Sequence, residues 1–151
     1  MRPCWILTLL ARGAVIGASV ALLGVARAGL VEDYDLVRLA LAEDRVDAAR
    51  AAAVALAERA PPEVAIAARA VAHAEDDRTA RLAFGELSRA TVLAVAADEP
   101  DVHVFRCPMA DGWSFWLQTD AGIANPYMGA RMPRCGFGTS LRAASRAAVR
   151  R

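Results

Sequence analysis

Sulfur-containing side chains gather in one stretch near the C-terminal end of this 151-residue chain. Two of the three cysteines and three of the four methionines lie there, with a histidine just before them. Cysteine thiolate and methionine thioether are soft donors, which select monovalent copper or silver over hard ions. Zinc fits less well, because the paired spacing Cys-x-x-Cys or His-x₃-His is missing. We therefore expect a soft-metal site whose candidate ligands are Cys107, Met109, Met132, Cys135, Met128 and His103.

The same two cysteines allow a second interpretation, in which Cys107 and Cys135 are bonded to each other. Cysteines of exported proteins usually pair. Closing the loop between Cys107 and Cys135 would stabilise the fold by about 3–4 kcal/mol in the chain-entropy model. Methionines beside tryptophans are also more often core residues than ligands. With a disulfide, Trp113, Trp116 and Tyr127 would form a small core or an exposed docking patch. With a metal, the same three side chains would form the second shell of its site. On either interpretation the two cysteines must lie close in space.

The first 28 residues are typical of a secretory signal peptide. Arg2 and Arg12 give a basic start, residues 13–25 form an uncharged apolar run, and residues 26–28 (Ala-Arg-Ala) fit a small-x-small cleavage site. The apolar run is shorter than the about 20 residues that a membrane-spanning helix needs. An uncleaved N-terminal anchor is the alternative, and Arg12 argues against it. We expect cleavage after Ala28 and a periplasmic mature chain.

Helical periodicity covers much of the predicted domain, residues 29–137. Apolar residues recur at three- and four-residue steps over residues 33–60, with Asp33 as the predicted N-cap and Pro61-Pro62 as the stop. Residues 62–97 repeat the pattern, either as two helices or as one, because no proline interrupts them. Alanine recurs along the apolar faces, so neighbouring helices could approach closely.

After Pro100 the period of the apolar residues changes. Residues 102–105 alternate, residues 113–118 are rich in aromatic side chains, and Asp111-Gly112 between them is a strong turn signal, so we expect a β-hairpin. The predicted fold is mainly α: an antiparallel helical hairpin or three-helix bundle with a small C-terminal β-hairpin and loop cluster. The arginine- and alanine-rich tail, residues 138–151, is expected to be a frayed end.

A set of residues recurs in a characteristic order along most of residues 34–137. The set is Arg81, Phe84, Leu87-Ser88, Cys107-Pro108-Met109-Ala110, Trp116-Leu117-Gln118, Asn125-Pro126-Tyr127, Gly129, Met132 and Cys135-Gly136. These residues resemble a domain of unassigned function from bacterial envelope proteins, which occurs alone behind a signal peptide or attached to adaptor subunits of copper and silver efflux systems. Met128 stands where that family has an aromatic residue. The adaptor body is absent from the sequence, so we do not expect the chain to be an adaptor itself.

The resemblance and the donor set together predict a soluble periplasmic accessory protein of copper or silver handling. It would bind a monovalent soft metal or dock to an efflux component, with no stable membrane span in the mature chain. The alternative is a disulfide-stabilised structural or interaction module with no metal. We do not expect an enzyme, since there is no Ser–His–acid set, redox Cys-x-x-Cys, haem motif or phosphate loop. The mature chain has 15 arginines and 17 acidic residues, a net charge of −2, which gives no electrostatic footprint for nucleic acid.

Overall fold

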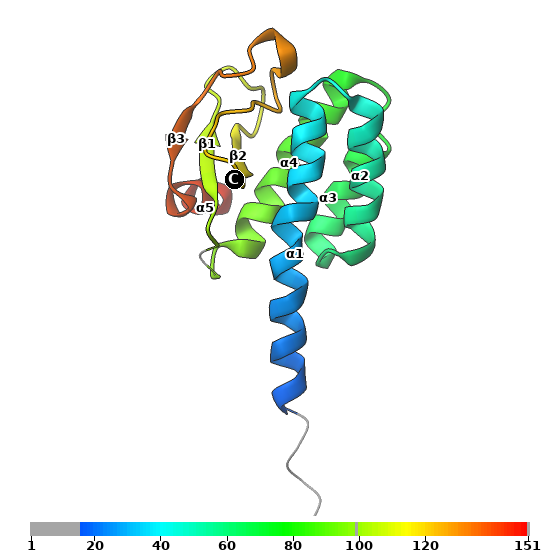
Figure 1. Ribbon diagram of the computed structural model, residues 1–151, viewed down its shortest axis with the longest axis vertical. Coiled ribbons are helices and arrows are strands. Elements are labelled where there is room, and N and C mark those ends of the chain that lie inside the picture. The colour runs from blue at the N-terminus through cyan, green and yellow to red at the C-terminus, as the bar shows by residue number, and fades with distance from the viewer. Residues whose placement is uncertain (1–15, 99, 151) are drawn as a thin grey trace, which may run out of the picture.

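The computed structural model describes residues 16–98 and 100–150, with side chains from residue 29 onward. It is mostly helical and carries one small antiparallel sheet (Figure 1), so the prediction of a mainly α fold is confirmed. No helix in the described part of the chain is both long and apolar enough to cross a membrane. The elements in chain order are α1 (Ile16–Ala42), α2 (Val46–Arg59), α3 (Pro62–Ala72), α4 (Asp77–Val95), β1 (His103–Arg106), β2 (Phe115–Gln118), the short 3₁₀ helix η1 (Gly129–Arg131), β3 (Phe137–Thr139) and α5 (Leu141–Val149).

Helix α1 begins well before the residue that the sequence pattern indicated. The basic start of the predicted signal peptide lies outside the described residues, and the predicted cleavage site falls within α1. The prediction of Asp33 as an N-cap is therefore wrong. Asp33 is an interior residue of α1, and its carboxylate pairs with Arg59 of α2 at 2.9 Å. The N-terminal part of α1 projects away from the other elements (Figure 1). Among the described side chains, the buried core begins at Leu30.

A tight turn at residues 43–45 separates α1 from α2, where the sequence pattern predicted a single helix over 33–60. Asp44 adopts a left-handed conformation with φ 57°, and the Arg45 N–H donates to the Ala40 carbonyl at 2.8 Å. Aspartate is one of the few residues other than glycine that visit this conformation routinely. The turn lets α2 fold back against α1 (Figure 1).

Residues 62–97 form two helices and not one. Pro62 begins α3 at a position where its missing N–H costs nothing. Helix α4 begins with a capping box, in which the Asp76 carboxylate accepts from the Thr79 N–H at 2.7 Å and the Thr79 hydroxyl accepts from the Asp76 N–H at 3.1 Å. These reciprocal bonds satisfy amide groups that would otherwise lack partners and fix the start of α4.

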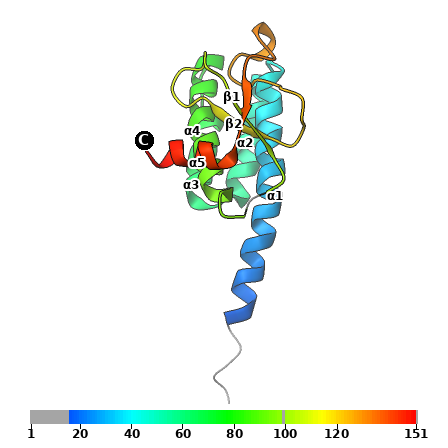
Figure 2. The same ribbon diagram turned by 90° about the vertical axis from the view of Figure 1, so that its left-hand side faces the viewer.

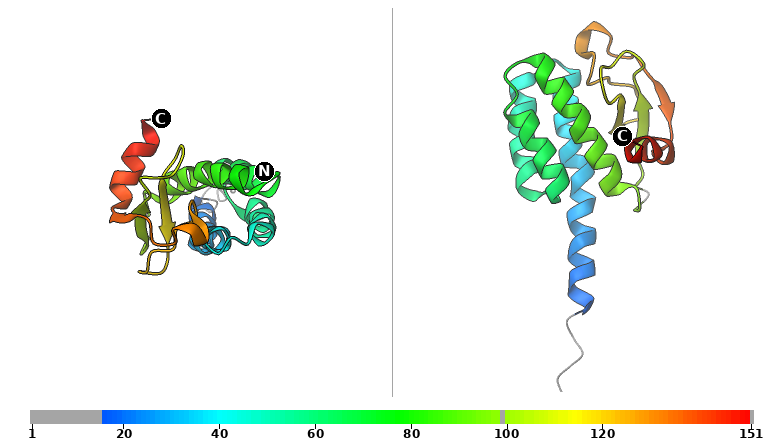
Figure 3. Two further views of the ribbon diagram at one scale, coloured as in Figure 1. Left: turned by 90° about the horizontal axis from the view of Figure 1, so that it is seen from above. Right: turned by 180° about the vertical axis from the view of Figure 1, so that it is seen from behind.

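Each of the helices α1 to α4 packs against the next one in the chain, and α1 also contacts α4. The described chain therefore has four packed helices before the sheet, where two or three were predicted. Ala49, Ala53, Ala68 and Ala80 are fully buried, and their small side chains allow the close approach that the sequence suggested. The helices form one side of the molecule and the sheet with α5 forms the other (Figure 3).

The strand order in the sheet is β2-β1-β3, with both pairs antiparallel. The β1–β2 pair is the predicted hairpin, and Phe105 lies opposite Trp116 across it. Strand β3 pairs with the other edge of β1 and was not predicted. Helix α5 follows it and lies crosswise to α1 (Figure 2), so the tail that we expected to be frayed is helical.

Helix α5 is held by an N-cap, by small buried residues and by the partly buried Leu141. The Ser140 hydroxyl accepts from the Ala143 N–H at 3.1 Å as an N-cap. Ala144 and Ala148 are buried where α5 meets α4 and β1. The tail therefore belongs to the packed domain.

Candidate functional site

The two cysteines of the C-terminal region lie side by side, as predicted. The sulfur atoms of Cys107 and Cys135 are 3.7 Å apart, and both thiols are free. Cys107 is fully buried, whereas Cys135 is half-buried. Cys107 follows β1 directly, and its N–H donates to the Ser114 carbonyl at 2.8 Å. Cys135 precedes β3, so the antiparallel pairing of β1 with β3 brings the two cysteines together.

The environment of the pair favours the protonated thiol at Cys135. Loss of solvent around its sulfur raises the pKa of Cys135, and the neighbouring Cys107 raises it further through a hydrogen bond and its charge. Thiolate is the form that binds metal or attacks a disulfide. Either reaction at Cys135 therefore has to remove a proton that is held more tightly than in a solvent-exposed cysteine.

Asn125 holds the segment that carries Cys135. Its side-chain amide donates to the Cys135 carbonyl, and its amide oxygen accepts from the N–H groups of Tyr127 at 2.7 Å and Met128 at 3.1 Å. Its own N–H donates to the Pro133 carbonyl at 2.9 Å. Asn125 is fully buried, so these bonds are not open to competition from water. This part of the Asn-Pro-Tyr motif therefore supports the cysteine segment.

Trp116 of β2 lies against the same segment, and Gln118 of β2 holds the Trp116 indole. The Trp116 indole N–H donates to the Gln118 side-chain oxygen at 2.9 Å, and the Gln118 amide donates to the Asp120 carbonyl at 2.6 Å. Gly136 has φ 147°, and a Cβ there would lie 2.8 Å from the Trp116 ring. Glycine at this position lets the backbone next to Cys135 lie directly on the indole.

A buried hydrogen-bond network joins the sheet to the helices. The Tyr34 hydroxyl of α1 donates to the Ser88 hydroxyl of α4 at 2.9 Å, and Ser88 donates to the Phe115 carbonyl of β2 at 2.9 Å. The Tyr127 hydroxyl donates to the same carbonyl at 2.6 Å. Burial raises the pKa of Tyr34 and of Tyr127 well above the usual tyrosine value. The network sets the distance between β2 and α4, and hence the position of the hairpin that carries Cys107.

The aromatic residues for which a docking patch was considered are core residues. Trp116 is fully buried, Trp113 is 3% exposed and Tyr127 is 7% exposed. Trp116 stacks on Phe105 with ring centroids 5.4 Å apart and meets Tyr127 edge-on. The prediction of an exposed docking patch made of these three side chains is therefore wrong. The three side chains belong to the core that fixes the hairpin and the loop.

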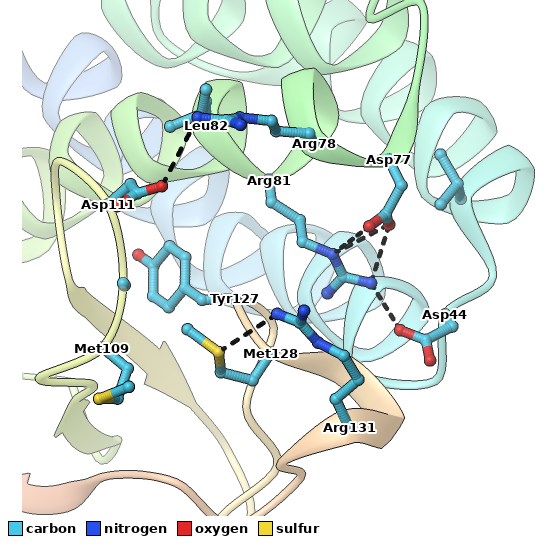
Figure 4. Close-up of a pocket in the computed structure, with 12 residues that line it drawn as sticks. Asp44, Asp77, Arg78, Arg81, Leu82, Met109, Asp111, Tyr127, Met128 and Arg131 are labelled. Carbon is cyan, nitrogen blue, oxygen red and sulfur yellow. Dashed lines mark hydrogen bonds and ion pairs between the residues drawn. The ribbon is translucent and has the colours of Figure 1, made fainter.

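The predicted methionine and histidine ligands take different positions relative to the cysteines. Met109 and Met128 line a separate pocket (Figure 4), and neither cysteine lines it. Met132 is 44% exposed, and its carbonyl accepts from the Cys135 N–H at 3.0 Å. His103 stands at the far end of β1, opposite Gln118. The described residues contain no group of three or more histidine, cysteine, aspartate or glutamate side chains that could hold a metal ion.

Arg81 is the main residue whose role the sequence did not reveal. Its side chain is 11% exposed and pairs with Asp44 at 2.6 Å and with Asp77 at 2.8 Å. The same guanidinium donates to the carbonyls of Leu41 at 2.9 Å and Pro126 at 2.5 Å. It thereby ties α4 to the α1–α2 turn and to the Asn-Pro-Tyr loop. The only sequence signal for Arg81 was its place among the residues that resemble the family.

Gly129 lets the Asp44 carboxylate complete this junction. Gly129 has φ 54°, and a Cβ there would lie 1.7 Å from Asp44 Oδ1. The other carboxylate oxygen of Asp44 accepts from the Ala130 N–H at 3.0 Å. The glycine of the Asn-Pro-Tyr-x-Gly motif is therefore required both for its backbone conformation and for space.

Comparisons with known proteins return no match for this chain: no family profile, no curated protein and no solved structure shows significant similarity to it. The site must therefore be interpreted from its own geometry. That geometry defines a mainly α protein with a small three-stranded sheet, in which the ends of two strands hold a pair of free thiols.

Proposed function

We propose that this protein is a periplasmic accessory protein of copper or silver handling whose binding group is the Cys107–Cys135 thiol pair. The observation that carries the proposal is the 3.7 Å separation of two free sulfurs. Thiolates are soft ligands, which suit monovalent copper and silver. Of the six predicted ligands, we retain Cys107 and Cys135 as the binding group. Met109 and Met128 line a different pocket.

The separation of the sulfurs suits a shared ion. With metal–sulfur distances of about 2.3 Å, as in zinc sites, two sulfurs on one ion lie about 3.7 Å apart at a tetrahedral angle and about 4.6 Å apart when linear. The observed 3.7 Å falls at the lower end of this range, so a small outward movement of the half-buried Cys135 would admit the ion. Trp116 and Tyr127 would exclude water from its buried side.

An anaerobic titration of the reduced, purified protein with monovalent copper against a competing chelator tests the proposal. We expect one ion to bind per chain, and we expect Cys107→Ser and Cys135→Ser each to abolish that binding. Met109→Leu and Met128→Leu are the matched controls and should leave the affinity unchanged. Copper affinity that survives both cysteine substitutions in a folded protein would overturn the proposal.

A second candidate is a disulfide-stabilised structural or interaction module without metal. The hydrogen bonds of the motif favour it. The polar side chains of Asn125, Gln118 and Tyr127 all bond to groups inside the fold. Oxidation of Cys107 and Cys135 would cross-link the end of β1 to the segment before β3. A thiol count on protein purified without reductant separates the candidates: two free thiols support the metal proposal, and none supports the module.

Export is part of both candidates. The N-terminal part of α1 projects away from the other elements (Figure 1), so its removal would leave their packing in place. Intact-mass analysis of protein from the envelope fraction should give a chain that starts at Gly29. Recovery of the full-length chain from the membrane would contradict this proposal.

A further inference from the structure

The structure contains a pocket of about 610 Å³ (Figure 4). It is formed by the first turns of α4, the loop that follows β1 and the segment from Tyr127 to Arg131, with Asp44 and Val46 closing one end. Its volume is within the range of about 300–1,000 Å³ that is usual for small-molecule sites. Neither cysteine lines it, so its use does not depend on the thiols.

Part of the pocket wall is apolar and exposed. Leu82 is 41% exposed and Met109 is 59% exposed, which is high for large apolar side chains. Ala110, Tyr127 and Met128 continue the same wall. The Tyr127 hydroxyl is already bonded to a backbone carbonyl, so the tyrosine contributes ring surface and not a free hydroxyl. A ligand with an apolar body would cover this wall and remove it from water.

The polar groups at the Asp44 end of the pocket have their hydrogen bonds within the protein. Arg81 donates to Asp44, Asp77 and two backbone carbonyls. Asp44 also accepts from the Ala130 N–H, and both oxygens of Asp77 accept from Arg81. None of these three side chains is a good partner for a ligand, because a ligand would have to displace an existing charged bond.

Two other arginines on the pocket have donors to spare. Arg131 contacts the Met128 sulfur at 3.8 Å. Arg78 lies 3.9 Å from Asp111, and the side chains of Arg78 and Asp111 are both about 80% exposed. Each guanidinium has five N–H donors. The arginines and aspartates that line the pocket are equal in number, so its net charge does not favour an anion. The unused N–H donors of Arg131 and Arg78 do. The Arg131 cation beside the Met128 sulfur also disfavours a metal ion there.

We propose that this pocket binds a small organic anion, a carboxylate or sulfonate carried on an aromatic or branched apolar body. The anionic group accepts hydrogen bonds from Arg131 and Arg78. The apolar body lies against Leu82, Met109 and the ring of Tyr127. This site is independent of metal binding by the cysteines, and it assigns Met109 and Met128 to ligand contact and not to metal.

The test is a fluorescence titration of the purified full chain with 8-anilinonaphthalene-1-sulfonate and with its uncharged analogue N-phenyl-1-naphthylamine. We expect the sulfonate to bind more tightly than the amine. Arg131→Gln and Arg78→Gln should each weaken the sulfonate by about fivefold, the effect of one partly exposed ion pair, and leave the amine unchanged. Met109→Glu should weaken the sulfonate further by repelling it.

Arg142→Gln on α5, an exposed arginine outside the pocket, is the matched control and should have no effect. Circular dichroism melts of every variant separate loss of the site from loss of the fold. Equal binding of the charged and uncharged probes would overturn the proposal. So would sulfonate binding that is unchanged in the folded Arg131→Gln, Arg78→Gln and Met109→Glu proteins.

Discussion

Gly129 occupies a position where a side chain would displace the Asp44 carboxylate. Its positive φ is one constraint, and the 1.7 Å that would separate a Cβ at this residue from Asp44 Oδ1 is a second. We predict that Gly129→Ala lowers the free energy of unfolding by about 2–4 kcal/mol, because it combines backbone strain with a steric clash. Urea unfolding followed by tryptophan fluorescence measures the change.

Gly138 of β3 provides the matched control for that substitution. A Cβ at Gly138 would meet nothing within 4 Å, and its φ is not in the left-handed region. Gly138→Ala should therefore leave the free energy of unfolding within about 0.5 kcal/mol of the parent. Equal effects of the two substitutions would show that the contact between Gly129 and Asp44 has no special weight.

The two tyrosines of the chain are both buried, which makes their ionisation a measure of the folded core. Burial raises the pKa of Tyr34 and Tyr127, so the folded state holds both protons above pH 10, where the unfolded chain releases them. Stability should therefore fall as the pH rises above about 10. We predict that tyrosinate absorbance appears only together with loss of the circular dichroism signal.

The reference for this titration is the same protein in denaturant, where both phenols should ionise near pH 10. Tyr34→Phe should halve the absorbance change and leave its coupling to unfolding in place. Reversible appearance of tyrosinate near pH 10 in a protein that keeps its native spectrum would contradict the buried network.

At the scale of elements, Arg81 joins α4 to the α1–α2 turn and to the Asn-Pro-Tyr loop through charged hydrogen bonds. It meets two carboxylates and two carbonyls while only 11% exposed. We predict that Arg81→Met destabilises the protein by about 2–4 kcal/mol, because both carboxylates and both carbonyls lose a charged donor. Thermal unfolding and urea unfolding both measure this change.

Arg89 lies on the same helix and serves as the control. It is 32% exposed and has a single ion pair with Glu86. Arg89→Met should change stability by less than about 0.5 kcal/mol. If Arg81→Met is as mild as Arg89→Met, the junction between α4, the turn and the loop is held by other contacts.

The sequence predicted the element types well where strong local signals occur. Pro61-Pro62 marks the end of α2 and the start of α3, and Asp111-Gly112 lies between the strands of the hairpin as expected. The break at Asp44 gave no such signal, since the apolar period continues on both sides of it. Its conformation depends on Arg81 and Ala130, which are distant in sequence. Strand β3 was missed because pairing with β1 holds it, and α5 because its buried residues are mainly alanines.

The candidate site was predictable only in part for the same reason. The closeness of Cys107 and Cys135 was predicted, since both a disulfide and a shared metal require it, and the structure confirms it. The grouping of the methionines with them was inferred from nearness in sequence. Met109 and Met128 lie instead on a pocket whose other wall belongs to α4, and no local pattern could indicate that contact.

For the whole molecule, α1 links the helical side to the sheet side. Tyr34 donates to Ser88 of α4 and accepts from the Leu117 N–H of β2. Arg38 is 1% exposed, pairs with Asp35 and donates to the Ala124 carbonyl at 3.2 Å. The residues from Leu30 to Leu41 of α1 therefore form part of the support of the cysteine segment as well as the core of the helices.

This arrangement predicts where the N-terminus can be shortened. A chain that starts at Gly29 keeps every buried residue of the described core and should unfold with the same midpoint as the full chain. A chain that starts at Leu36 loses Leu30, Tyr34 and the Asp35 carboxylate. That loss leaves the buried Arg38 cation without its carboxylate partner, a change that alone costs about 3–5 kcal/mol. We expect the shorter chain to be unfolded by circular dichroism and proteolysis, and native spectra from it would show that α1 is dispensable.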